Sequence, residues 1–211
     1  MARKQREVRN IVGRGSTAGA GEAMSVPRII GGTLGGRKLI YALAQERTRP
    51  MKDRTREAVF NLIGPSARGK HAIDLFAGTG ALGFEALSRG AARATFIEQH
   101  FPTAAVIRQN AAELGVTNQT NVHSASAFIW AQEEGLDQVM PWLVFCSPPY
   151  AFYLERREAM LALIGTLLAR APGESIFVVE ADRRFEINQL PDAERWDVRE
   201  YPPAVVAIYR K

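Results

Sequence analysis

The sequence predicts an α/β fold: a seven-stranded, mostly parallel sheet with helices on both faces, closed by a C-terminal antiparallel hairpin. Two observations carry this prediction. From residue 71 onward, short runs of apolar and β-branched residues alternate with longer segments of helical spacing, which is typical of a doubly wound parallel sheet. Near the C-terminus, two strand-like runs are joined through Pro202-Pro203 with no helix between them, so these strands should pair antiparallel.

Each element has a local signature. In front of the alternating region we expect a helix at residues 53–63, because apolar residues recur there at helical spacing, Asp53 stands at the N-cap position and Gly64-Pro65 ends the run. The expected strands are residues 71–77, 94–98, 120–123, 142–146, 175–180, 196–201 and 205–209. The expected helices between them are residues 79–89, 102–114, 126–134 and 152–171.

The chain divides by composition into three parts. Residues 1–25 are rich in Arg, Lys, Gly and Ser and have almost nothing to bury, so we expect a disordered basic tail. Residues 26–66 form a small N-terminal extension, in which two short β-type runs around glycines, between Arg28 and Ile40, predict a hairpin with a basic tip followed by the first helix. Residues 67–211 hold the sheet.

Positive charge is concentrated at the front of the chain. The formal charge is +5, but residues 1–70 carry 15 Lys and Arg against 5 Asp and Glu, whereas residues 71–211 carry 12 against 17. The front should therefore face a polyanion such as a nucleic acid. The side chains that we expect to contact phosphates are Arg37, Lys38, Arg49, Lys52, Arg54 and Arg56.

Composition also argues against several classes of protein. The apolar runs, such as residues 142–146, are far too short to cross a membrane, and no secretory signal is recognisable. We therefore expect a cytoplasmic protein with no membrane partner. The single cysteine, Cys146, cannot form an internal disulfide, and the three histidines are dispersed, so we expect no metal site. We also expect a monomer.

A glycine-rich turn follows the first predicted strand of the sheet. Gly78, Gly80 and Gly83 satisfy the pattern G-x-G-x-x-G, and the acidic residue Glu98 ends the next strand twenty positions after Gly78. This arrangement is typical of a Rossmann-like nucleotide pocket. It fits a dinucleotide such as NAD as well as it fits S-adenosylmethionine.

Asp74 favours the second of these cofactors. Its carboxylate stands at the end of the first strand, where it would repel a pyrophosphate but would suit a ligand that carries an ammonium and a sulfonium. Glu98 would accept hydrogen bonds from two ribose hydroxyls, and residues 124–128 would contact adenine. The alternative for Asp74 is a cap for the helix at 79–89, about five residues early for that role. The expected cofactor-binding residues are Asp74, Phe76, Gly78, Thr79, Gly80, Glu98, Ser126 and Ala127.

A second motif, Ser147-Pro148-Pro149-Tyr150, follows the predicted strand at residues 142–146. The lone pair of an exocyclic amine on a base is delocalised into the ring, so an enzyme that methylates the amine must aim hydrogen-bond acceptors at its hydrogens. The Ser147 hydroxyl and the Pro148 carbonyl would be these acceptors, and Tyr150 would stack on the base. Alone, the motif is equally consistent with a rigid turn. Together with the glycine turn it predicts that Ser147, Pro148 and Tyr150 are catalytic.

The two motifs together resemble those of class I S-adenosylmethionine-dependent methyltransferases that modify exocyclic amino groups. More narrowly, the chain resembles the RsmD family from about Arg28 to Arg210. The resemblance is carried by residues 28–32, 36–39, 49–61 and, most specifically, 74–91. It implies methyl transfer to the N2 of a guanine in small-subunit (16S) ribosomal RNA, with that RNA or the small-subunit particle as partner.

Two positions depart from the family pattern. Ser147 stands where the family usually has Asp before Pro-Pro, and Ser126-Ala127 stand where an Asp or Asn often contacts adenine. A neutral hydroxyl makes a weaker hydrogen bond than a carboxylate. Ser-Pro-Pro-Tyr also resembles the motif of DNA methyltransferases that act on cytosine N4. The alternatives are therefore methylation of cytosine N4 or adenine N6, a weak or degenerate cofactor-binding RNA-binding protein and, from the glycine pattern alone, a nicotinamide dehydrogenase.

Overall fold

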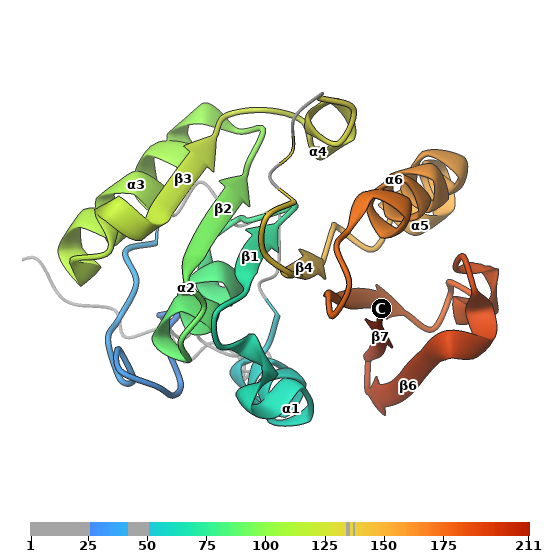
Figure 1. The fold of residues 1–211 in the computed structure, drawn as a ribbon, viewed down its shortest axis with the longest axis horizontal. Helices are drawn as coiled ribbons and strands as arrows, with labels where there is room; N and C mark the ends of the chain where they lie inside the picture. The colour runs from blue at the N-terminus through green and yellow to red at the C-terminus, as the bar shows by residue number, and fades with distance from the viewer. Residues whose placement is uncertain (1–25, 42–50, 134–135, 137) are drawn as a thin grey trace, which may run out of the picture.

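The structure, a computed structural model, describes residues 26–41, 51–133, 136 and 138–211. Its strands are β1 (His71–Asp74), β2 (Arg93–Ile97), β3 (Thr120–His123), β4 (Trp142–Cys146), β5 (Ile176–Asp182), β6 (Trp196–Tyr201) and β7 (Ala204–Arg210). They form one sheet in the order β3-β2-β1-β4-β5-β7-β6 (Figure 1). The first five strands are parallel, and β7 lies antiparallel to both β5 and β6. The predicted sheet and its closing hairpin are confirmed.

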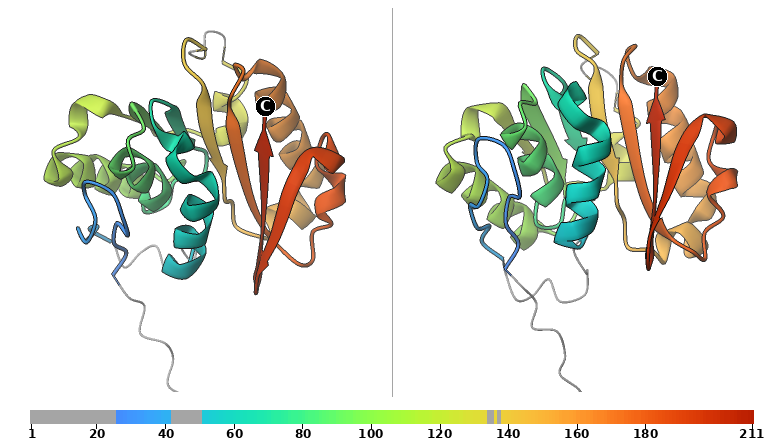
Figure 2. Two further views of the ribbon diagram at one scale, coloured as in Figure 1. Left: turned by 60° about the horizontal axis from the view of Figure 1, so that its bottom comes forward. Right: turned by 90° about the horizontal axis from the view of Figure 1, so that it is seen from below.

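Helices cover both faces of the sheet. They are α1 (Asp53–Ile63), α2 (Ala81–Ser88), α3 (Phe101–Leu114), α4 (Ala127–Trp130), α5 (Phe152–Glu155) and α6 (Arg157–Arg170). Apolar residues of α1, α2 and α3 pack on the face that carries Leu143 and Phe145, whereas α4, α5 and α6 pack on the face that carries Val144 (Figures 1 and 2). Every residue of β4 is buried, as expected for a central strand covered on both faces.

The strand order reverses between β1 and β4. The chain runs from β1 to β2 and β3 on one side, and then returns to β4 on the other side of β1. In open α/β sheets, ligands bind beyond the carboxyl ends of the strands at such a point. The glycine turn follows β1 and the Ser-Pro-Pro-Tyr corner follows β4, so the topology brings the two motifs together.

The glycine turn lets α2 approach the sheet closely. A Cβ atom on Gly83 would lie 2.3 Å from the ring of Phe96 in β2, so only glycine fits at this helix position. Gly80 precedes the first residue of α2 with a φ of 76°, a left-handed conformation that favours glycine. These two glycines therefore shape the turn and its packing.

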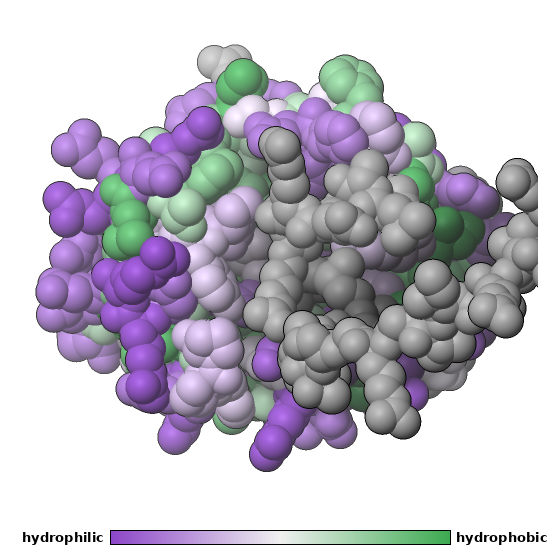
Figure 3. Space-filling model, turned by 180° about the vertical axis from the view of Figure 1, so that it is seen from behind, coloured by the Kyte–Doolittle hydropathy of each residue, from purple (hydrophilic) through white to green (hydrophobic). Residues whose placement is uncertain are grey.

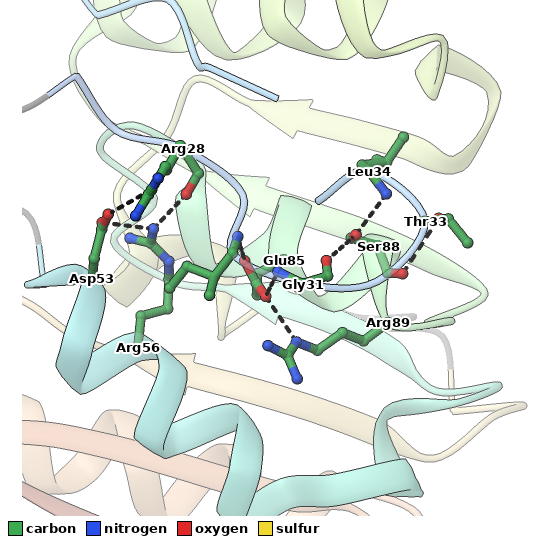
Figure 4. A network of polar contacts seen from close by, with 10 residues as sticks. Arg28, Gly31, Thr33, Leu34, Asp53, Arg56, Glu85, Ser88 and Arg89 are labelled. Atoms are coloured by element: carbon green, nitrogen blue, oxygen red, sulfur yellow. Dashed lines mark hydrogen bonds and ion pairs between the residues drawn. The ribbon is translucent and has the colours of Figure 1, made fainter. Parts of the chain in front are cut away.

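The N-terminal extension packs directly on α2 (Figure 4). The buried carboxylate of Glu85 accepts hydrogen bonds from the backbone N–H groups of Ile30 (2.7 Å) and Gly31 (3.0 Å) and pairs with Arg89 at 2.7 Å. Ile29 and Leu39 are buried in the same apolar cluster as α2. The predicted hairpin is only partly formed, because a single bridge, between Arg28 and Lys38, is its β-pairing within the described residues.

Several predicted boundaries differ from the structure. Lys52, not Asp53, is the N-cap of α1, since Asp53 is already helical and its carboxylate pairs with Arg56. The helix predicted at 126–134 is only α4, and the helix predicted at 152–171 is interrupted at Arg156, which leaves the helical conformation with φ −130° and ψ 31°. The predicted tail at residues 1–25 lies outside the described residues.

Charge protects the sheet edge formed by β6. Residues 197–200 of this strand are exposed, and Arg199 pairs with Asp197 at 3.0 Å while Arg183 pairs with Glu200. Figure 3 shows hydrophilic side chains gathered along the margin where the β6–β7 hairpin lies, at the left of that view. Charged residues on an edge strand disfavour the addition of a strand from another chain.

Candidate active site

A cavity of about 1050 Å³ lies beyond the carboxyl ends of the central strands. Its walls come from the turn after β1, the end of β2, residues 125–128 after β3, residues 147–152 after β4 and Glu180 in β5. Tyr41, Met51 and Lys52 of the N-terminal extension also line it. A cavity of this size holds a nucleoside cofactor together with part of a second ligand.

Most of the predicted site residues line this cavity. These are Phe76, Gly78, Thr79, Glu98, Ser126, Ala127, Ser147, Pro148 and Tyr150, together with Lys52 and Arg56 of the predicted RNA-binding set. Asp74 and Gly80 are not among the lining residues, and Gly80 instead sets the start of α2. The glycine turn and the Ser-Pro-Pro-Tyr corner therefore share one cavity, although nearly seventy residues separate them in the chain.

Glu98 ties the glycine turn to the start of α3. One carboxylate oxygen accepts a hydrogen bond from the backbone N–H of Gly78 at 2.9 Å, and the other accepts one from the N–H of His100 at 2.8 Å. A carboxylate has about four acceptor positions, so each oxygen retains one for a ligand. The side chain is thus held in place at the cavity wall with acceptors to spare, as ribose hydroxyls require.

Asp74 is buried beside the same turn, with 1% of its surface exposed. One carboxylate oxygen, Oδ2, accepts a hydrogen bond from the N–H of Gly83 at 3.2 Å. The other, Oδ1, is buried and has no hydrogen-bond partner among the described residues. Burial raises the pKa of Asp74 to about 7; the Gly83 hydrogen bond lowers it and the charge of Glu98 raises it.

Asp74 also has a structural role at the start of α2. Sequence distance argued against a cap for α2, yet the turn folds back far enough for Asp74 to accept the N–H of Gly83, the third residue of that helix. The other oxygen, Oδ1, is a buried acceptor without a donor among the described residues. Because Asp74 does not line the cavity, a ligand bound there would meet the charge of this carboxylate and not the oxygen itself.

Three aromatic rings form an apolar wall of the cavity. Phe76 follows β1, Phe128 lies in α4 and Phe152 begins α5. The ring of Phe76 lies 6.0 Å from each of the other two, which are 6.4 Å apart, measured between ring centroids. Such a cluster suits a flat heterocycle such as adenine. Phe152 was missed in the sequence because it lies beyond the motif, inside a segment predicted as helix.

At the Ser-Pro-Pro-Tyr corner, two hydroxyls bind one carboxylate. Ser147 donates a hydrogen bond to one oxygen of Glu180, and Tyr150 donates to the other at 2.8 Å. Glu180 is 4% exposed; burial raises its pKa, while the two hydroxyl donors lower it. The Ser147 hydroxyl, expected to be an acceptor for the substrate, is here a donor to Glu180.

Glu180 is the site residue that sequence reasoning missed. Residues 176–181 are otherwise apolar or small and fully buried, so an acid among them carries a signal that was available and not used. A carboxylate therefore lies beside the corner, on the neighbouring strand, although position 147 itself is Ser.

The basic residues fall into separate groups. Arg37, Lys38, Lys52 and Arg54 are exposed. Arg56, expected to contact phosphate, borders the cavity but is only 1% exposed, and its guanidinium donates to the carbonyl of Arg28 and to Asp53 at 2.9 Å. It therefore serves to hold the N-terminal extension on α1. Arg49 lies outside the described residues.

Across the described residues, no three His, Cys, Asp or Glu side chains form a group that could hold a metal ion. None of the helices in that same part of the chain combines the length and the apolar character needed to cross a membrane.

Comparisons with known proteins give matches over most of the chain. Residues 27–210 match the family model described as conserved hypothetical protein 95. Ribosomal RNA small subunit methyltransferase D of Haemophilus influenzae is 33% identical over 187 residues, covering 87% of this chain and 91% of that protein. The structure of yhhF, a candidate methyltransferase from Escherichia coli, superposes with a TM-score of 0.72 at 29% identity, covering 89% of this chain and 98% of that one. An RNA methyltransferase from Salinibacter ruber, solved with S-adenosyl-L-homocysteine, shares the fold at 17% identity, with a TM-score of 0.56 over 77% of this chain and 93% of that one.

Proposed function

Because this chain belongs to the RsmD family of S-adenosylmethionine-dependent ribosomal RNA methyltransferases, we propose that it methylates the exocyclic N2 of a guanine in small-subunit ribosomal RNA. The observation that carries the proposal is the shared cavity, in which the glycine turn and Glu98 lie on one side and the Ser147 to Tyr150 corner on the other. One side suits a nucleoside cofactor, and the other suits a flat base with an amine.

The residues present fit this cofactor. S-adenosylmethionine supplies an electrophilic methyl group on its sulfonium, and the transfer forms an N–C bond, breaks a C–S bond and releases one proton from the amine. Glu98 would accept the ribose hydroxyls, and the rings of Phe76 and Phe128 would wall the adenine. Asp74 lies behind the glycine turn and does not line the cavity, so it would act on the cationic end of the ligand through its charge and not by direct contact.

The corner would position the amine. The Pro148 carbonyl, held by the two consecutive prolines, would accept one amine hydrogen, and the Glu180–Ser147 pair would provide further acceptor oxygens. Acceptors placed in this way pull the amine lone pair out of conjugation with the ring, so that it can attack. Tyr150 would stack on the flipped base.

Methyl transfer can be measured directly. Small subunits that lack the modification are incubated with labelled S-adenosylmethionine and the protein, and the nucleosides are then separated. We expect label in N2-methylguanosine, and none when fully modified subunits are used as the control. Label in cytosine or adenine would contradict the proposed base, whereas no label with cofactor binding intact would favour a degenerate RNA-binding protein.

The exposed basic residues of the front half are proposed to hold RNA phosphates. This set is Arg37, Lys38, Lys52 and Arg54, and Arg49, which lies outside the described residues, is added to the proposal from the sequence alone. Lys52 lines the cavity itself, and Arg54 lies two residues further on in α1. Both would therefore contact the RNA close to the target base.

A double substitution, Lys52→Gln with Arg54→Gln, should weaken RNA binding and flatten its salt dependence. Each lost phosphate contact reduces the slope of log K against log salt by roughly 0.7–0.9. RNA affinity is measured at several salt concentrations, with Arg199→Gln on the edge strand β6 as the matched control. A slope equal to that of the unmodified protein would show that these two residues do not contact RNA.

A further inference from the structure

We propose that Glu180 selects guanine, by accepting hydrogen bonds from both N1–H and N2–H of the base. This inference rests on the proposed function and names the residue that sets the choice of base.

The sheet fixes Glu180 opposite the corner. Cys146 at the end of β4 pairs in register with Val179, which places Ser147 beside Glu180 on the neighbouring strand. The carboxylate lines the cavity and is held through both of its oxygens, one by Ser147 and one by Tyr150. Each hydroxyl occupies one of about four acceptor positions, so both oxygens can still accept a hydrogen bond from a ligand.

The edge of guanine matches two adjacent acceptors. Its ring N1–H and its amine N2–H are neighbouring donors, and a carboxylate can bind both at once. The amines of cytosine and adenine lie next to a ring nitrogen that is an acceptor. Facing Glu180, that nitrogen would meet a second acceptor in a buried site, where unpaired polar groups are costly.

If Glu180 had a purely structural role, its substitution would not change the preference for one base over another. A brace for Ser147 and Tyr150 needs only to accept from two hydroxyls and would be indifferent to the ring nitrogen of the base. Glu180→Gln separates the two roles, because a glutamine keeps the size and one acceptor oxygen but replaces the other oxygen with a donor.

The experiment uses RNA with guanine or 2-aminopurine at the labelled position. 2-Aminopurine keeps the amine but has an acceptor at N1. We expect the unmodified protein to methylate 2-aminopurine about 10- to 100-fold more slowly than guanine, the range for one bidentate base contact. With Glu180→Gln, guanine methylation should fall by a similar factor, and the ratio of 2-aminopurine to guanine rates should rise about tenfold or more.

Cofactor binding by calorimetry confirms that the variant is folded, and Glu200→Gln on β6 is the matched control. If Glu180→Gln lowers the methylation rates of guanine and 2-aminopurine equally and cofactor binding is retained, Glu180 only holds Ser147 and Tyr150 in place. That result would overturn the inference. If the variant does not fold, the unmodified protein still decides the question: equal rates on guanine and 2-aminopurine overturn the inference, and discrimination supports it. Methylation of cytosine or adenine in place of guanine overturns both the inference and the proposed function, whereas guanine methylation without discrimination overturns the inference alone.

Discussion

Asp74→Asn is expected to make the cofactor-free protein more stable at pH 8 while weakening its binding of S-adenosylmethionine. Burial raises the pKa of Asp74 from 3.8 to about 7. Between these values the folded state holds a proton that the unfolded state has lost, so stability falls as the pH rises from about 4 to about 7. Above that window the native carboxylate is charged, buried and only partly hydrogen-bonded.

Asparagine avoids this penalty because it is neutral at every pH and keeps an acceptor for the N–H of Gly83. We expect a gain of roughly 1–3 kcal/mol in the free energy of unfolding at pH 8, the cost of a buried unsatisfied polar group. Little change is expected at pH 4, where both side chains are neutral. Denaturant unfolding at the two pH values measures the difference, with Asp197→Asn on the exposed edge strand as the control. A gain that is equal at both pH values would contradict this account.

Cofactor binding should respond in the opposite direction. A cationic ligand in the neighbouring cavity favours the ionised carboxylate of Asp74 and lowers its pKa, so binding below about pH 7 should release a proton. Affinity for the unmodified protein should therefore rise with pH up to about 7 and then level off. In Asp74→Asn this dependence should vanish and the affinity should fall. Calorimetry in buffers of different ionisation enthalpy measures the released proton, and binding without proton release at pH 6 would rule out this electrostatic coupling between Asp74 and the ligand.

The fold was predictable because the spacing of apolar residues and the local composition both change where one helix or strand ends and the next begins. The alternation after residue 71 predicts the strands to within a few residues, and helix α1 begins and ends where its apolar spacing does. The carboxyl ends of parallel strands meet at one edge of a sheet. The sequence alone therefore predicts that Glu98 and the corner at Ser147 lie near the glycine turn, and all three line one cavity.

What could not be predicted depends on contacts between distant segments. Sequence alone does not distinguish an exposed arginine from a buried one. Arg56 is buried because the carbonyl of Arg28 and the carboxylate of Asp53 accept hydrogen bonds from its guanidinium. The pairing of Ser147 with Glu180 depends on the register between β4 and β5, which no local pattern encodes. From the sequence, Ser147 in place of Asp therefore indicated a weaker hydrogen bond to the substrate amine, although the carboxylate of Glu180 lies beside it in the structure.

Tyr150→Ala is expected to lower methyl transfer about 10- to 100-fold while leaving S-adenosylmethionine affinity unchanged. Stacking of a base on an aromatic side chain contributes roughly 1–3 kcal/mol, and each 1.4 kcal/mol corresponds to about a factor of ten in rate. Tyr150→Phe is the matched variant, since it keeps the ring and loses only the hydrogen bond to Glu180. Single-turnover methylation of saturating RNA, with calorimetry for the cofactor, separates the two contributions. A small loss of methylation rate in Tyr150→Phe and a large loss in Tyr150→Ala would assign the effect to stacking. Equal losses would mean that the hydroxyl acts by holding Glu180 in place and that the ring does not stack on the base.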